Sequence, residues 1–161
     1  EVATEFKNAI VSDSNWGIVA TAIQQSEQLL KATLDGKEEI VAAAIDAIHS
    51  DATSVLQYND ENSLACVLTL AYYTSQKDYM RVRELPTGKG FADIVLIPRP
   101  NCNKPAVVLE LKYDQSADTA ITQIHDKRYA GMLKDFAGEV VLVGINYDKA
   151  TKKHECRIEK V

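Results

Sequence analysis

Three charged side chains, Asp93, Glu110 and Lys112, interrupt two stretches of the chain that are otherwise apolar. Side chains alternate between the two faces of a β-strand, so Glu110 and Lys112 share one face while Leu109 and Leu111 point to the opposite side. If the strand that carries Asp93 pairs with the strand that carries Glu110, the three charges can converge. Charges are costly to bury unless they are paired or bind a metal. This cost makes the three residues candidates for function.

The chemistry available to this set is that of a divalent metal site. Two carboxylates, completed by backbone carbonyl and water oxygens, suit Mg²⁺ or Mn²⁺. Such a metal lowers the pKa of a bound water and neutralises charge that develops on a phosphorus centre. Lys112 could orient that water or stabilise the transition state. The alternative is a Glu110–Lys112 pair on an exposed strand face, with Asp93 as a polar residue near a turn.

Two residues on predicted helices could complete the site. Glu61 lies three residues before Leu64 and seven before Leu68, in line with an apolar stripe, so its carboxylate could reach the metal. Its alternative is a helix N-terminal acid that the helix dipole favours. Gln123 lies on a later helix, where it could bind water or phosphate, or be an ordinary polar residue.

The elements that must position these residues follow from the change of hydrophobic period along the chain. The expected helices cover residues 15–34, 38–48, a segment that follows 58–60, and 116–133. The expected strands cover residues 79–85, 91–98, 106–113, 139–146 and 154–161. The wholly apolar run 140–145 suits a central strand buried on both faces. Hairpin-connected strands followed by a helical crossover imply an α/β fold, with helices on the faces of a mixed sheet.

The bulk properties fit one ordinary domain. The chain has 161 residues, of which 46% are hydrophobic and 25% charged. It has no signal-peptide pattern and no apolar run near the roughly 18–20 residues that cross a bilayer. Its three cysteines are far apart, which predicts a reduced, intracellular protein without structural zinc. The first residue is Glu1, which fits a piece excised from a longer polypeptide.

The net charge of −5 counts against a dedicated nucleic-acid binder, because such proteins are usually basic. Local basic patches and a metal can nevertheless supply affinity for phosphate. Lys127 and Arg128, with nearby lysines, could form a basic rim for a substrate phosphate. A solvated basic face is the alternative.

These motifs resemble a known group. The series Glu61, Gly90-Phe-Ala-Asp93, Glu110-Leu-Lys112 and Gln123-Ile-His-Asp-Lys-Arg-Tyr129 resembles the PD-(D/E)xK nuclease superfamily. More narrowly, it is similar to the nuclease-like C-terminal domain that follows an AAA-type ATPase-like domain in bacterial and archaeal proteins. The resemblance covers residues 55–161, and Ala92 stands where the superfamily name has Pro.

The resemblance implies a restriction-endonuclease-like core of αβββαβ order over residues 53–161, with residues 1–52 as a helical connector packed on the same domain. It also implies a metal held by Asp93, Glu110, the Leu111 carbonyl and, as a further candidate, Glu61. Lys112 would be the catalytic lysine.

The sequence therefore predicts a cytoplasmic, Mg²⁺- or Mn²⁺-dependent nuclease that acts on DNA in preference to RNA. An upstream ATPase-like domain would be its partner. The alternative is a catalytically silent module that docks an ATPase domain or partner through its N-terminal helices. The intact set of Asp93, Glu110 and Lys112 favours the enzyme, whereas the acidic balance favours the module.

Overall fold

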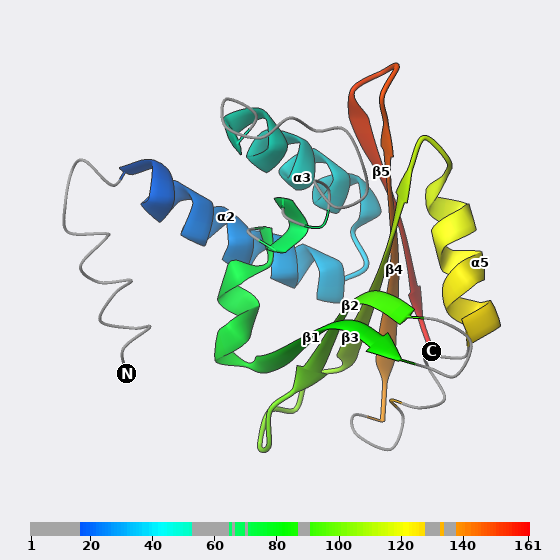
Figure 1. Cartoon of the computed structure of the whole chain (residues 1–161). Helices are drawn as coiled ribbons and strands as arrows, with labels where there is room; N and C mark the ends of the chain where they lie inside the picture. Colours follow the sequence, from blue (N-terminus) through cyan, green and yellow to red (C-terminus); the bar gives the residue numbers. More distant parts are fainter. Residues whose placement is uncertain are drawn as a thin grey trace.

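The computed structural model describes residues 17–52, 65, 67–69, 71–86, 91–127, 133 and 138–161. These residues form a five-stranded sheet with helices on both faces (Figure 1). The strands are β1 Tyr79–Pro86, β2 Phe91–Pro98, β3 Ala106–Tyr113, β4 Val140–Asp148 and β5 Lys153–Lys160. The helices are α2 Gly17–Leu34, α3 Glu38–Ala52, the 3-10 helix η2 Tyr73–Lys77 and α5 Ala117–Lys127. This is the α/β, restriction-endonuclease-like architecture that the sequence predicts.

The strands lie in the sheet in chain order, from β1 to β5. Neighbours pair antiparallel except β3 and β4, which are parallel because α5 carries the chain across one face between them. The sheet is therefore mixed. Strand β4 lies between β3 and β5, and its residues Val140 to Tyr147 are all buried. The prediction that this apolar run forms a central strand is confirmed.

One core fills the space between the sheet and the two N-terminal helices. Leu29 of α2 and Ile45 of α3 are fully buried in the same cluster as Leu109 of β3 and Val143 of β4. A short connection at Gly36, where φ is +74°, turns α2 into α3. Glycine adopts this left-handed conformation at little cost. The helical hairpin is thus part of the main hydrophobic core.

A second core lies on the opposite face, under α5. Ile121 and Ile124 of α5 pack with Val108 of β3 and Leu142 of β4. The even-numbered residues of β3 and β4 point to this side because side chains alternate along a strand. Figure 1 shows α5 on one side of the sheet, and α2 and α3 on the other. Any chemistry on the even positions of β3 takes place beneath α5.

Helix α3 also runs beside β5, the outer strand of the sheet. The Glu38 carboxylate accepts from the backbone N–H of Ile158 (2.7 Å), and the Asp46 carboxylate accepts from that of His154 (2.9 Å). The two acids are eight residues apart and lie on the same side of the helix. They satisfy amides of β5 that do not pair with β4.

The predicted elements agree closely with the observed ones. The predicted bounds of β2 and β3 match residue for residue, while β4 and β5 each differ by one or two residues at their ends. The third predicted helix is described only at Ala65, residues 67–69 and Ala71, which are helical. Glu61, the predicted turn at 87–90 and residues 128–132 lie outside the described residues. Within the part of the chain that is described, no helix is both long and apolar enough to cross a membrane.

Candidate active site

The pairing of β2 with β3 sets the position of the two acids. Ile94 lies opposite Leu109 in this antiparallel ladder, so the same register puts Asp93 opposite Glu110. The backbone N–H of Leu111 donates to Asp93 Oδ2 (2.7 Å), which ties the Asp93 side chain to β3. Leu109 and Leu111 belong to the core under α2 and α3, so Glu110 lies on the α5 face. The predicted division of the two faces is confirmed.

Three donors surround one oxygen of Glu110. Gln123 Nε2 and Lys127 Nζ, both from α5, donate to Oε1, the latter at 3.0 Å. Lys112 Nζ lies 3.8 Å from the same oxygen, close enough for an ion pair. The Glu110 side chain is only 1% exposed, so these contacts form out of solvent. The structure thus brings Gln123 and both lysines to one carboxylate oxygen.

The other oxygen of Glu110 has different surroundings. Oε2 is buried and has no hydrogen-bond partner among the described residues. A buried acceptor without a partner costs roughly 1–3 kcal/mol, so native proteins rarely keep one unless it serves a purpose. Oε2 is therefore the atom of this site that is open to an additional ligand.

The charge balance at Glu110 is also incomplete. Burial and then the charge of Asp93 raise the pKa of Glu110, against the hydrogen bond and charge of Lys127 and the charge of Lys112. The net effect raises this pKa to about 7. A carboxyl group whose pKa lies near neutral despite two adjacent lysines needs more positive charge nearby to stay ionised. A cation near Asp93 and Glu110 would supply it.

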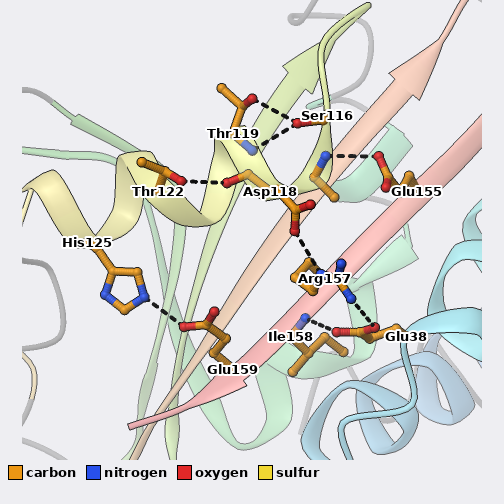
Figure 2. Close-up of polar contacts among 11 residues, drawn as sticks. Glu38, Ser116, Asp118, Thr119, Thr122, His125, Glu155, Arg157, Ile158 and Glu159 are labelled. Carbon is orange, nitrogen blue, oxygen red and sulfur yellow. Dashed lines mark hydrogen bonds and ion pairs between the residues drawn. The ribbon is translucent and has the colours of Figure 1, made fainter.

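Helix α5 is held at its first turn by β4, β5 and its own N-cap. The backbone N–H of Ala117 donates to Glu155 of β5, and that of Gln115 donates to Asn146 of β4, each at 3.0 Å. Ser116 acts as the N-cap by accepting from the N–H of Thr119 (3.0 Å). Figure 2 shows the contacts of Glu155 and Ser116 at this end of the helix. These bonds fix the start of the helix that carries Gln123 and Lys127.

A ladder of side-chain contacts continues along the flank of α5 that faces β5 (Figure 2). Arg157 of β5 donates to Asp118 (2.8 Å) and, at 3.4 Å, to Glu38 of α3. The hydrogen bond and charge of Arg157 lower the pKa of Asp118. In its last turn, the helix places His125 Nε2 2.7 Å from Glu159. The flank toward β5 is thus polar, opposite the flank that reaches Glu110.

A comparison with protein families decides the assignment. Residues 59–156, more than half of the chain, match the model of the PD-(D/E)XK nuclease superfamily. The chain belongs to the PD-(D/E)XK nuclease superfamily. Most members of this superfamily are nucleases, and they generally use divalent metals such as Mg²⁺ or Mn²⁺. No curated protein matches the chain significantly.

The donor set of this superfamily member fits such a metal. Asp93 and Glu110 are neighbouring carboxylates of the hard-oxygen type that such metals prefer, and Glu110 Oε2 has no hydrogen-bond donor among the described residues. The described residues contain no group of three or more His, Cys, Asp or Glu that could hold a metal. Further ligands would therefore be backbone, water or substrate oxygens, or Glu61, which lies outside the described residues.

Several residues of this site have positions that sequence reasoning did not give. The sequence assigns Lys127 to substrate phosphate, whereas its ammonium group lies on Glu110. The sequence predicts no role for Asn146 and Glu155, which accept from backbone amides at the start of α5. Asn146 does carry a signal, because it is a polar residue at the end of an apolar strand; Glu155 carries none. Arg128 lies outside the described residues.

Proposed function

We propose that this domain is a metal-dependent nuclease that hydrolyses phosphodiester bonds, in DNA rather than RNA. The observation that carries the proposal is the unequal environment of Glu110. One oxygen accepts from Gln123 and Lys127. The other is buried and has no hydrogen-bond partner among the described residues. The negative charge of Asp93 acts on the same carboxylate. A structural ion pair has no need of such an arrangement.

The carboxylates of Asp93 and Glu110 would hold the metal, with the Leu111 carbonyl and Glu61 as further candidate ligands. When bound, Mg²⁺ or Mn²⁺ supplies positive charge at the phosphate and makes the attacking water more acidic. In the reaction, the water oxygen forms a bond to phosphorus and the bond to the leaving sugar oxygen breaks. The water gives up a proton, and the leaving oxygen gains one.

The lysines would act on the substrate. Lys112 shares the strand face of Glu110, so its ammonium group can donate to the attacking water or to a phosphate oxygen. Lys127 already contacts Glu110 through Oε1, and an ammonium group has three donors. It can therefore hold Glu110 and contact a substrate phosphate together with Arg128. Gln123 would fix the orientation of the carboxylate by donating to the same oxygen.

The context of the domain is part of the same proposal. We expect it to form the C-terminal part of a larger ATPase-like protein, with α2 and α3 adjoining the upstream domain. The two described cysteines, Cys102 and Cys156, are free thiols. Free thiols suit a reducing compartment such as the cytoplasm.

Two substitutions test the proposal in a nuclease assay on linear DNA with Mn²⁺ or Mg²⁺. Lys112→Ala should lower the rate about 10²–10³-fold, the usual cost of one transition-state donor, while Mn²⁺ still binds by calorimetry. Glu110→Ala should lose metal binding and activity together, because it deletes a metal oxygen. Lys149→Ala, at an exposed lysine of the turn between β4 and β5, is the matched control and should behave as wild type.

The opposite results would overturn the assignment. Equal metal-dependent cleavage by wild type, Lys112→Ala and Glu110→Ala would mean contamination or another site. Chelator should stop the reaction, and cleavage that persists in chelator would exclude the proposed chemistry.

A silent interaction module is the second candidate, and the net charge of −5 favours it. A metal titration separates the two functions without any substrate. If the domain is a silent module, neither wild type nor Asp93→Asn should release heat of Mn²⁺ binding in calorimetry. If it is a nuclease, wild type should bind Mn²⁺ and Asp93→Asn should not.

A further inference from the structure

A single row of residues crosses three neighbouring strands beneath α5. Glu110 of β3 pairs with Gly144 of β4, and Gly144 pairs with Arg157 of β5. Glu110 and Arg157 both meet α5, through Gln123 and Asp118 respectively. The glycine lies between these two contacts, directly under the helix.

The helix lies so close to β4 at this point that only glycine fits. A Cβ atom on Gly144 would lie 2.5 Å from the carbonyl oxygen of Ala117, and 3.0 Å from both Ala120 Cβ and Ile121 Cγ1. The nearest of these atoms belongs to the helix backbone, which cannot rotate aside as a side chain can. Any side chain at position 144 must therefore move α5 itself away from the sheet.

Helix α5 has one polar flank on each side of its contact with Gly144. Successive helical residues are about 100° apart, so Ala117, Ala120 and Ile121 face the sheet together. Gln123 and Lys127, one turn apart, lie on the flank toward β3. Asp118 and His125, two turns apart, lie on the flank toward β5, where they contact Arg157 and Glu159. The contacts to β5 fix the rotation of α5 about its axis. Gly144 fixes the height of α5, that is, its distance from the sheet.

Whether Gln123 and Lys127 reach Glu110 depends on both the rotation and the height of α5. Gln123 and Lys127 contact the same oxygen of Glu110. Hydrogen bonds of this kind have a useful range of only about half an ångström, from roughly 2.7 to 3.2 Å. A displacement of α5 by about an ångström would therefore weaken both contacts to Glu110 without changing any residue of the site, because each side chain would have to extend to keep its bond.

We propose that Gly144 is a positioning residue of the active site, which sets the height of α5 so that Gln123 and Lys127 reach Glu110. The Arg157–Asp118 and Glu159–His125 contacts fix the rotation of the helix. The inference rests on the proposed function only for its consequence in catalysis. The positioning itself is a property of the fold and can be measured without substrate.

The test is Gly144→Ala, read by the side-chain amide signals of Gln123 in a ¹H–¹⁵N NMR spectrum. These signals are identified by their loss in Gln123→Leu. In Gly144→Ala they should move to the position of a solvent-exposed glutamine, because the bond to Glu110 is lost. On linear DNA with Mn²⁺, kcat should fall at least roughly tenfold, a fraction of the 10²–10³ typical of a lost donor, with a smaller change in KM.

Gly138→Ala is the matched control. Gly138 has a φ of +70° and would meet nothing within 4 Å of an added Cβ, so alanine there strains the backbone without touching α5. It should lower stability and leave the Gln123 signals in place. If Gly144→Ala does not fold, Ala120→Ser adds one atom to the same interface from the helix side and should shift the Gln123 signals in the same direction.

The outcomes separate the two proposals. A folded Gly144→Ala or Ala120→Ser protein with wild-type Gln123 signals would overturn the positioning role, whatever its activity. Wild-type protein without nuclease activity, but with Gln123 signals that move in Gly144→Ala, would retain the positioning role and remove the proposed function.

Discussion

The Asp93 carboxylate has both a structural and a chemical role. Its Oδ2 accepts from the N–H of Leu111, a residue that is 1% exposed, while its charge acts on Glu110. Removal of this side chain would delete a proposed metal ligand and also leave a buried N–H without its partner. The two effects can be separated by the choice of substitution.

We therefore expect Asp93→Ala to lower the free energy of unfolding by about 1–3 kcal/mol, the cost of an unsatisfied buried donor. Asp93→Asn keeps an oxygen for the Leu111 N–H and should lose much less. Both should lose Mn²⁺ binding, because alanine removes the oxygen ligand and asparagine removes its negative charge. Urea unfolding and calorimetry on the two variants measure these quantities, and equal stability losses would contradict the role of Oδ2.

The two lysines next to Glu110 should differ in their contributions to stability and to the rate of cleavage. Lys127 is 3.0 Å from Oε1 and forms a hydrogen bond, whereas Lys112 is 3.8 Å away. Lys127→Met should lower the free energy of unfolding by about 1.5–3 kcal/mol, the usual worth of a hydrogen bond to a charged group. Lys112→Met should cost less stability and more of the rate. The reverse order, measured by urea unfolding and DNA cleavage, would mean that the roles are exchanged.

Among the elements, α5 depends on distant residues for its first turn. The Ala117 amide is one of the N–H groups that have no partner within a helix, and Glu155 of β5 satisfies it. Glu155→Ala should destabilise the protein by about 1 kcal/mol, as for a lost cap, and speed hydrogen exchange at Ala117. Glu155→Gln keeps the oxygen and should restore most of the protection. Glu139→Ala, at an exposed residue just before β4, is the control and should change neither.

The strands could be predicted because their signals are local. Alternation, apolar runs and flanking turn residues set β2 and β3, and the same alternation placed Glu110 and Lys112 on one face. The contact between Lys127 and Glu110 could not be predicted in this way. It depends on the height and rotation of α5 above the sheet, which Gly144 and β5 determine from more than fifteen residues away in the chain.

At the scale of the whole molecule, the N-terminal helices and the sheet share one core. Leu29, Val41 and Ile45 are fully buried in the same cluster as Leu109. Deletion of residues 1–52 would expose a large part of this core to water, although Leu68 and Tyr72 would remain, so we expect the remaining chain not to fold. Circular dichroism and thermal unfolding of residues 53–161 test this, with a deletion of residues 1–16 as the control because it removes none of these contacts. A cooperatively folded 53–161 fragment would show that the hairpin is dispensable.

The same interface should make the protein sensitive to acid. His49 of α3 and His154 of β5 are buried with ring centroids 5.4 Å apart, and burial lowers the pKa of both. Asp46, which contacts His154, opposes this effect, while Lys153 adds to it at His154. The unfolded chain then binds more protons below about pH 6.5, so stability is present above that pH and is lost as the pH falls.

Urea unfolding between pH 7.5 and 5 measures this dependence. Each histidine can contribute at most about 1.4 kcal/mol per pH unit. His154→Gln should flatten the profile relative to wild type, and Lys149→Gln, at an exposed lysine of the turn between β4 and β5, should not. Glu110, whose pKa is raised to about 7, acts in the opposite direction in this window but affects wild type and His154→Gln alike. Profiles of equal slope in these two proteins would show that Asp46 compensates the burial of His154 in full.

The carboxylates of Glu38 and Asp46 have a consequence beyond the single molecule. An outer strand with open amides can recruit a strand of another chain and begin aggregation. On β5, two of these amides are already bonded to α3, at Ile158 and His154. A strand from a second molecule would have to displace a helix that belongs to the main core before it could pair there. The contacts that hold α3 against β5 therefore also prevent this edge from acting as a template for a strand of another chain, and they come from two acids that lie far from Glu110.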